Sequence, residues 1–149
     1  MPVLHERLRT NLPVEPAFDF VADFANASAW DPGTATAERI GGGPVETGAR
    51  YRLGVRMGGS VRPMEYVITA YERPHRVVLA GEGSGVSATD TITFEPDAEG
   101  TRIDYTADIR LRGLLRLASP IAGGQFAKIG SQARDGMQRT LDQIAEQAA

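Results

Sequence analysis

Acidic and tyrosine side chains at inward positions of predicted strands are the groups in this chain best suited to acid–base chemistry. Asp90 stands first among them, because strand alternation places it on the same face as Ile92 and Phe94. A carboxyl that faces an apolar cavity is either solvated at the end of its strand or raised in pKa and able to transfer protons. A glycine-rich stretch precedes the strand Thr89–Glu95, and this favours the solvated alternative.

Glu65 raises the same question on another predicted strand. That strand, Met64–Tyr71, is apolar on both faces, so the direction of Glu65 is left open. Tyr51 and Tyr105 fall on predicted inward faces, where a phenol either orients a ligand carbonyl or phenol by hydrogen bonding or fills space. The candidates for proton transfer are therefore Asp90, Glu65 and Tyr105.

Several other kinds of chemistry lack the residues that they require. There are no cysteines, which excludes disulfides and thiolate ligands. His5 falls on a predicted strand and His75 on a turn, and neither has metal-ligand spacing to a partner. The residues that a serine triad requires are also lacking. The run Gly81–Gly85 is spaced like part of a dinucleotide fingerprint, but no helix follows it to receive a pyrophosphate. We predict neither a metal site nor a cofactor.

Length and composition are those of an ordinary globular protein. The 149 residues fit one domain, 1–149, with 42% hydrophobic and 23% charged residues. A net charge of −3 argues against a nucleic-acid surface, which normally carries a basic face. The N-terminus has charges where a signal peptide needs an apolar run, and no window reaches the ~18 apolar residues of a membrane span. We expect a cytoplasmic monomer or homodimer.

Alternating apolar and polar residues predict seven strands. The connections between successive strands are mostly short, which favours an antiparallel meander. The predicted strands are Val3–Thr10, Thr34–Ile40, Ala49–Met57, Met64–Tyr71, Val77–Ala80, Thr89–Glu95 and Thr101–Leu111.

The segment from Leu12 to Pro32 interrupts this series after the first strand. Its apolar spacing, with Phe18, Val21 and Ala22 on one face, predicts an amphipathic helix that leads into an Asn/Ser-containing segment closed by Trp30-Asp31-Pro32. Trp30 is the sole tryptophan, and two roles are open for it. Either it is a core or rim residue whose indole N–H bonds a carbonyl, or it lines a cavity mouth and stacks on a ligand.

A long amphipathic helix is predicted at the end of the chain. Its apolar stripe recurs at steps of three and four residues and consists of Phe126, Ile129, Ala133, Met137, Leu141 and Ile144. Gly130 and Gly136 each cost about 1 kcal/mol relative to alanine in a helix. They indicate either close packing of the helix on the sheet or room for a ligand.

The segment Leu111–Ile121 combines apolar residues with Arg112 and Arg116. It could touch a membrane during lipid pickup. Two cations in so short a segment favour a bent entry into the last helix, with both arginines reaching water. No stable membrane anchor is predicted.

A series of short motifs, in this order and spacing, carries a resemblance to a known family. They are Val14–Asp23, Trp30-Asp31-Pro32, Gly48-Ala49-Arg50, Glu65-Tyr66-Val67, Glu72–Val77, Gly100-Thr101-Arg102 and Arg112–Arg116. Together with the closing helix, they resemble the polyketide cyclase/dehydrase-like branch of the START/Bet v 1-type helix-grip (SRPBCC) superfamily. The resemblance covers nearly the whole chain.

The resemblance implies an α+β helix-grip fold. A seven-stranded curved antiparallel sheet would surround the long C-terminal helix, with two short helices after the first strand. Such proteins usually hold a hydrophobic cavity between helix and sheet, for lipids, polyketides, sterols or hormones. Residues expected to contact a ligand there are Trp30, Tyr51, Leu53, Val55, Val67, Asp90, Ile92, Tyr105, Phe126, Ile129, Ala133 and Met137.

Two classes of function follow from this expectation. The preferred class is a binding module, a carrier or sensor for a small hydrophobic or aromatic molecule that is polyketide-like or lipid-like. The alternative is an aromatase/cyclase-type enzyme that folds a polyketide in the same cavity by proximity and orientation. The family has no universal catalytic residues, and His and Cys are absent from the predicted inner faces, so binding is favoured.

Overall fold

Eleven elements make up the part of the chain that the computed structural model describes, residues 3–112 and 123–148, with backbone alone for 123–127. In chain order they are β1 (Val3–Thr10), α1 (Val14–Ala22), the 3-10 helix η1 (Phe24–Asn26), α2 (Ala27–Trp30), β2 (Thr34–Ile40), β3 (Arg50–Met57), β4 (Ser60–Glu72), β5 (Arg76–Gly83), β6 (Val86–Asp97), β7 (Gly100–Leu111) and α4 (Gly123–Ala148).

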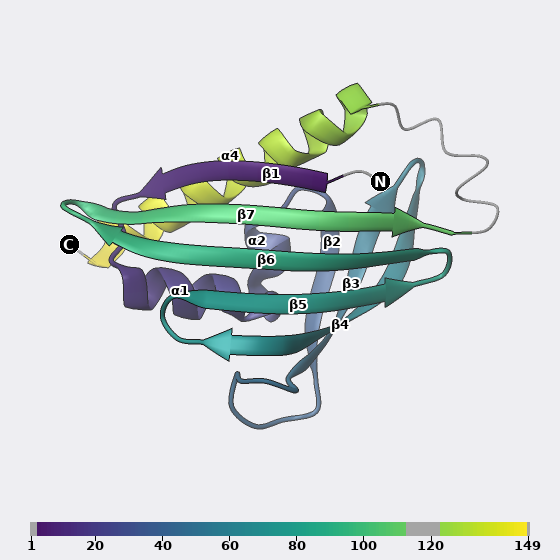
Figure 1. Cartoon of the computed structure of the whole chain (residues 1–149), viewed down its shortest axis with the longest axis horizontal. Helices are drawn as coiled ribbons and strands as arrows, with labels where there is room; N and C mark the ends of the chain where they lie inside the picture. Colours follow the sequence, from purple (N-terminus) through teal and green to yellow (C-terminus); the bar gives the residue numbers. More distant parts are fainter. Residues whose placement is uncertain (1–2, 113–122, 149) are drawn as a thin grey trace.

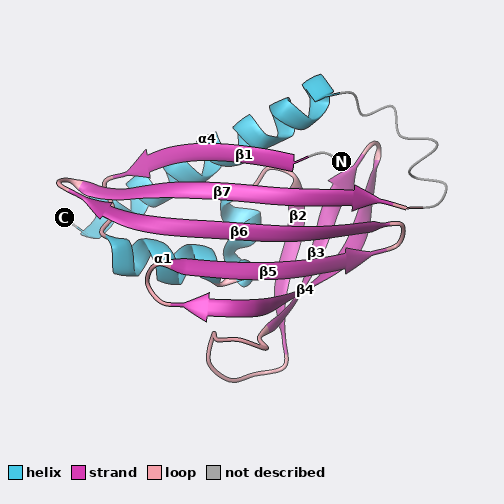
Figure 2. Ribbon diagram, viewed as in Figure 1, coloured by secondary structure: helices cyan, strands magenta, loops and turns pink. Residues whose placement is uncertain are grey.

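The strands form one antiparallel sheet in the order β1-β7-β6-β5-β4-β3-β2. Every neighbouring pair except β1–β7 joins consecutive strands, because short connections bring each strand back beside the last one. The sheet curls, so that α4 lies along its concave side (Figure 1). α1 contacts β6 and β7, and α2 lies between β2 and α4. The predicted helix-grip fold, with short helices after the first strand, is confirmed (Figure 2).

Three strands are longer than the alternation pattern predicts. β4 begins at Ser60, β5 continues to Gly83 and β6 begins at Val86, so the expected glycine-rich link is mostly paired strand. The glycines of β5 lie opposite large side chains, since Gly81 pairs with Tyr66 and Gly83 with Met64. These pairings give the glycines a role in packing that strand propensity alone does not reveal.

The apolar core joins α1 to the sheet and to the end of α4. The Phe18 ring of α1 meets the rings of Tyr71 and Phe94 edge to face, with ring centroids 5.3 Å and 5.1 Å away. Met137 and Leu141 of α4 are also fully buried. Burying such apolar side chains stabilises the fold by about 1.5–3 kcal/mol each before entropy is counted.

The glycines of α4 lie where the helix approaches other parts of the chain closely. A Cβ atom at Gly136 would stand 2.1 Å from the backbone carbonyl oxygen of Trp30. One at Gly130 would stand 3.0 Å from a carboxylate oxygen of Glu6 on β1. Close packing therefore accounts for Gly136, although its neighbour is the end of α2 rather than the sheet.

Some expectations fall on parts of the chain that are not described. Most of the segment Leu111–Ile121 and the side chain of Phe126 lie outside the described residues. Within 3–112 and 123–148, no helix is both long and apolar enough to cross a membrane.

Candidate functional site

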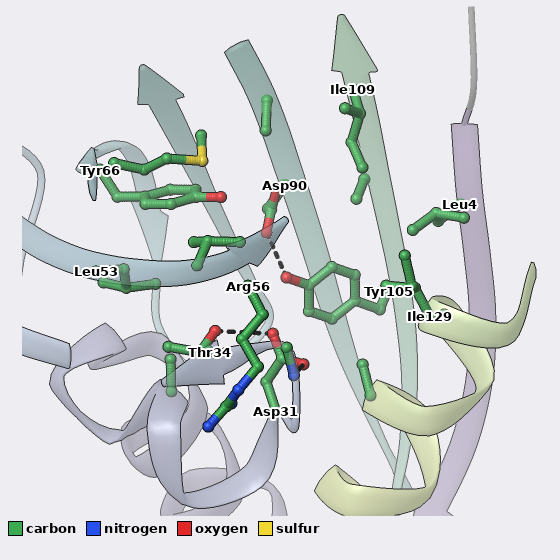
Figure 3. A pocket seen from close by; sticks show the side chains of 18 of the residues that line it. Leu4, Asp31, Thr34, Leu53, Arg56, Tyr66, Asp90, Tyr105, Ile109 and Ile129 are labelled. Carbon is green, nitrogen blue, oxygen red and sulfur yellow. Dashed lines mark hydrogen bonds between the residues drawn. The ribbon is translucent and has the colours of Figure 1, made fainter. Parts of the chain in front are cut away.

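A cavity of about 540 Å³ lies between the concave face of the sheet, α2 and α4. Its walls are mostly aliphatic and aromatic, as expected for a site that takes a largely apolar ligand. Ile129 of α4, which is 42% exposed, marks a side where the cavity meets solvent. Figure 3 shows the polar side chains that interrupt this apolar surface.

Most residues that the sequence assigns to the lining do lie there: Trp30, Leu53, Val55, Asp90, Tyr105, Ile129, Ala133 and Met137. Tyr51, Val67 and Ile92 do not. Tyr51 is wholly buried between Phe24 and the guanidinium of Arg39, 5.5 Å from its ring centroid. Ile92 is also fully buried, in the hydrophobic core.

Glu65 and Val67 share the face of β4 that points away from the cavity. Strand alternation places them opposite in direction to the buried Met64 and Tyr66. Glu65 is about half exposed and lies 3.5 Å from Arg50. The candidate role of Glu65 in proton transfer within the cavity is therefore wrong, since its carboxylate lies on the convex side of the sheet.

Asp90 and Tyr105 form the central polar pair of the cavity. The Tyr105 hydroxyl donates a hydrogen bond to Asp90 Oδ2 (Figure 3). Burial raises the pKa of Asp90 to about 7, with a further rise from the charge of Asp31, although the Tyr105 hydrogen bond opposes both. The solvated alternative is therefore wrong, because β6 starts four residues before Asp90 and the residue is 5% exposed.

Tyr66 is a functional candidate that the sequence reasoning missed. It projects from the concave face of β4, and its hydroxyl points toward Asp90 (Figure 3). Burial raises the pKa of Tyr66, and the nearby charges of Asp90 and Asp31 raise it further. Val67 makes the strand apolar on both faces, so the sequence alone provided no signal for the direction of Tyr66, which the burial of Met64, Tyr66 and Ile68 now shows.

Trp30 and Asp31 end α2 at the cavity wall. The Trp30 ring meets Tyr105 edge to face at 6.0 Å, and its indole Nε1 has no hydrogen-bond partner among the described residues. The expected carbonyl partner is therefore missing from this part of the chain. Asp31 accepts hydrogen bonds from the Gly33 amide and the Thr34 hydroxyl, both at 2.9 Å, while burial raises its pKa.

Within residues 3–112 and 123–148, three arginines also line the cavity, and the sequence predicted none of them. Arg56 donates to the Pro32 carbonyl at 2.6 Å, and Arg134 lies 3.4 Å from Glu6. Arg62, on β4, is half-buried and has no recorded acceptor among the described residues.

The arrangement is suited to binding and to proton transfer. An apolar wall with one acidic pair can hold a neutral polar group of a ligand through Asp90 and Tyr105. A carboxyl whose pKa is near 7 can also give or accept a proton. Within the described part of the chain, no group of three or more His, Cys, Asp or Glu side chains could hold a metal ion.

Solved structures of low sequence identity share this fold. A START superfamily protein from Mycobacterium smegmatis is 14% identical over 99% of each chain, with a TM-score of 0.71. The ZhuI aromatase/cyclase from Streptomyces sp. R1128 is 14% identical over 97% of this chain and 95% of that chain, with a TM-score of 0.73. A conserved protein from Geobacillus kaustophilus is 19% identical over 95% and 96%, with a TM-score of 0.71.

Comparison of the sequence with models of protein families identifies the family of this chain. No curated protein sequence matches this chain. The model of the family described as "Polyketide cyclase / dehydrase and lipid transport" matches residues 1–149. The chain therefore belongs to the polyketide cyclase/dehydrase and lipid transport family.

Proposed function

We propose that the protein binds a small, largely apolar molecule in the cavity between α4 and the sheet. The ligand carries at least one hydroxyl or carbonyl group, which the Asp90–Tyr105 pair receives. A carrier and a sensor both fit this description.

The observation that carries the proposal is the cavity of about 540 Å³, which is apolar on most of its surface and has polar side chains at a few places. Sites for small molecules commonly combine an apolar wall with a few converging polar groups that fix orientation. Among the described residues, Tyr66 of β4, Asp90 of β6 and Tyr105 of β7 are polar groups of this kind. Family membership supports the same proposal.

Native mass spectrometry of the protein as purified, followed by solvent extraction, tests the proposal. A bound compound would appear as an adduct on the intact protein and would be identified in the extract. The protein should also bind apolar aromatic probes in titration. Failure of every apolar compound to bind a folded sample would contradict a ligand-binding role.

Trp30 provides an independent readout, because it is the sole tryptophan and lines the cavity. A ligand that occupies the cavity should change the intensity or wavelength of its fluorescence. Titration of the Trp30→Phe variant should show no such change, while calorimetry on the same variant should still detect binding. This pair of results would separate cavity binding from binding elsewhere on the surface.

An aromatase/cyclase-type enzyme is the second candidate, supported by the position and pKa of Asp90. As a carboxylate it would accept a proton from a carbon between two ketide carbonyls. As the new carbon–carbon bond forms, the neutral acid would return this proton to the resulting alkoxide, which becomes a hydroxyl. Asp90 would then take the second proton from the same carbon and give it to that hydroxyl, which leaves as water as the carbon–carbon double bond forms. Tyr105 would hold the carboxyl in place through its hydrogen bond.

Asp90→Asn separates the two candidates. In a binding module, the variant should fold and lose on the order of 1 kcal/mol of ligand affinity, the value of one hydrogen bond. In an enzyme, it should lose about 10²–10⁴-fold in turnover on a polyketide substrate while its affinity changes little. Unchanged affinity and thermal stability together with lost turnover would favour the enzyme.

A further inference from the structure

Arg62 is an inward-facing cation near one end of the cavity. It pairs with Val55 across the β3–β4 ladder, and paired residues of antiparallel strands point to the same face. Val55 lines the cavity, as do Met64 and Tyr66, which follow Arg62 at two-residue steps on β4. The β3–β4 hairpin lies at the same end of the molecule as the first described turns of α4 (Figure 1). Arg62 thus stands at this end of the cavity rather than on the convex surface.

The charge of Arg62 is not balanced within the described residues. Of the three arginines at the cavity, Arg56 donates to a carbonyl and Arg134 pairs with Glu6, whereas no acceptor is recorded for Arg62. The stretches of sequence outside residues 3–112 and 123–148 contain no aspartate or glutamate. A half-buried cation beside apolar walls is stabilised by an anion that enters with the ligand.

A complementary group lies deeper in the cavity. Asp90 Oδ2 accepts the Tyr105 hydroxyl, and the Tyr66 hydroxyl, which points toward Asp90, makes no recorded hydrogen bond within the described residues. A ligand hydroxyl could accept from Tyr66 and donate to Asp90 together.

The sheet register separates these two polar regions. Asp90 on β6 pairs with Leu79 on β5, and Leu79 pairs with Ile68 on β4, so Asp90 lies level with Ile68 across the sheet. Arg62 lies six positions before Ile68 on β4. At about 3.3 Å per residue, the offset along the strands is roughly 20 Å between Cα atoms. The long side chains of Arg62 and Tyr66 shorten the gap that a ligand must span. An elongated molecule with a polar group at each end fits this spacing.

We propose that the cavity selects an elongated amphipathic acid, with its carboxylate at Arg62 and a hydroxyl at its far end held by Asp90, Tyr66 and Tyr105. The inference rests on the proposed binding function and specifies the class and orientation of the ligand. A single guanidinium balances one negative charge, so a monoanionic carboxylate suits Arg62 better than a dianionic phosphate. Apolar chain atoms lie against Met64 and Val55 between the two ends.

Isothermal titration calorimetry with four matched compounds tests the inference: ω-hydroxydodecanoic acid, dodecanoic acid, dodecane-α,ω-diol and dodecylamine. The hydroxy acid should bind most tightly, and the amine most weakly because Arg62 repels it. Arg62→Met should weaken both acids by about ten- to hundred-fold, as expected for a lost hydrogen bond to a charged group. It should leave the affinity for the diol unchanged, and Arg62→Lys should restore part of the acid affinity.

Two further variants show whether the effect is local. Arg52→Met removes an arginine of the convex face, 3.2 Å from Glu38, and should change no affinity. Asp90→Asn should weaken the hydroxy acid while leaving dodecanoic acid as it was. Equal affinity for acid, diol and amine, unchanged in Arg62→Met, would overturn the inference and leave the proposed binding function standing. Failure of all four compounds and of every other apolar probe would overturn the binding function itself.

Discussion

The ring of Tyr66 occupies the space that a side chain at Gly81 would need. The two residues are partners in the β4–β5 ladder, and a Cβ atom on Gly81 would stand 2.5 Å from a ring carbon of Tyr66. With that space free, the ring lies across β5 and its hydroxyl points toward Asp90 on the next strand (Figure 3). Gly81 is therefore a positioning residue for the polar cluster of the cavity.

Gly81→Ala should displace the Tyr66 ring and weaken ligand binding. The added methyl group should lower the free energy of unfolding by about 1–3 kcal/mol, the usual range for overpacking. Urea denaturation and calorimetric titration would measure the two effects. Gly59→Ala is the matched control, because a Cβ there meets nothing within 4 Å. An unchanged affinity in Gly81→Ala would show that the position of Tyr66 has no influence on the ligand.

The stability of the protein should fall as the pH rises from about 4 to 7. Folding raises the pKa of Asp90 from 3.8 to about 7, chiefly through burial, so the folded state favours the neutral acid. The stabilisation is complete below the unfolded pKa and is lost as the pH rises through this window. At about 1.4 kcal/mol per pKa unit, the loss is on the order of 4 kcal/mol.

Asp90→Asn isolates this contribution, because an amide does not titrate. Burial raises the pKa of Asp31 too, so a smaller slope of the same sign should remain in the variant. Urea denaturation of both proteins across the window measures the difference. Parallel stability curves for the wild type and the variant would mean that Asp90 titrates normally in the folded protein.

Met137→Ala should cost less stability than Leu141→Ala, although both residues are fully buried on α4. Met137 lines the cavity, so part of its surface already lacks packing partners, whereas Leu141 lies in the core away from the lining. We expect a loss toward the upper end of about 2–5 kcal/mol for Leu141→Ala and toward the lower end for Met137→Ala. Chemical denaturation at one pH gives both values. A larger loss for Met137→Ala would contradict the presence of open space beside its side chain.

The two glycines of α4 should respond to alanine with opposite signs. Gly136→Ala should destabilise the protein, because the new methyl group meets the backbone carbonyl of Trp30 at 2.1 Å. Gly130→Ala should be neutral or gain up to about 1 kcal/mol from helix propensity. Its neighbour, at 3.0 Å, is the flexible Glu6 carboxylate, which can move aside. Thermal unfolding of the two variants side by side tests the contrast.

The fold was predictable because its signals are local. Alternation identified all seven strands, and three- and four-residue spacing identified α4, since both patterns come directly from the burial of one face. The strand ends were less predictable. Ser60–Pro63 and Gly81–Gly83 contain turn-forming or small residues, yet tertiary pairing extends β4 and β5 through them.

The candidate site was predictable in part, for the same reason. Asp90 and Tyr105 lie on clear inward faces, and both line the cavity. Arg62 was missed because the predicted strand began two residues after it, and a residue in a presumed turn has no assigned face. Tyr51 shows the remaining difficulty: its face is inward, but the depth of a side chain depends on neighbours such as Phe24, which come from elsewhere in the chain.

The contact between Gly136 and the Trp30 carbonyl has a consequence for redesign of the cavity. At that contact, backbone meets backbone, so trimming a side chain there gains no space and the helix cannot be brought closer. At the other end, Ile129 and Arg62 line the cavity, and their side chains can be exchanged for smaller ones. Variants selected for bulkier ligands should therefore accumulate changes around Ile129 and Arg62, while the Gly136 contact acts as a fixed anchor for the remodelled binding site.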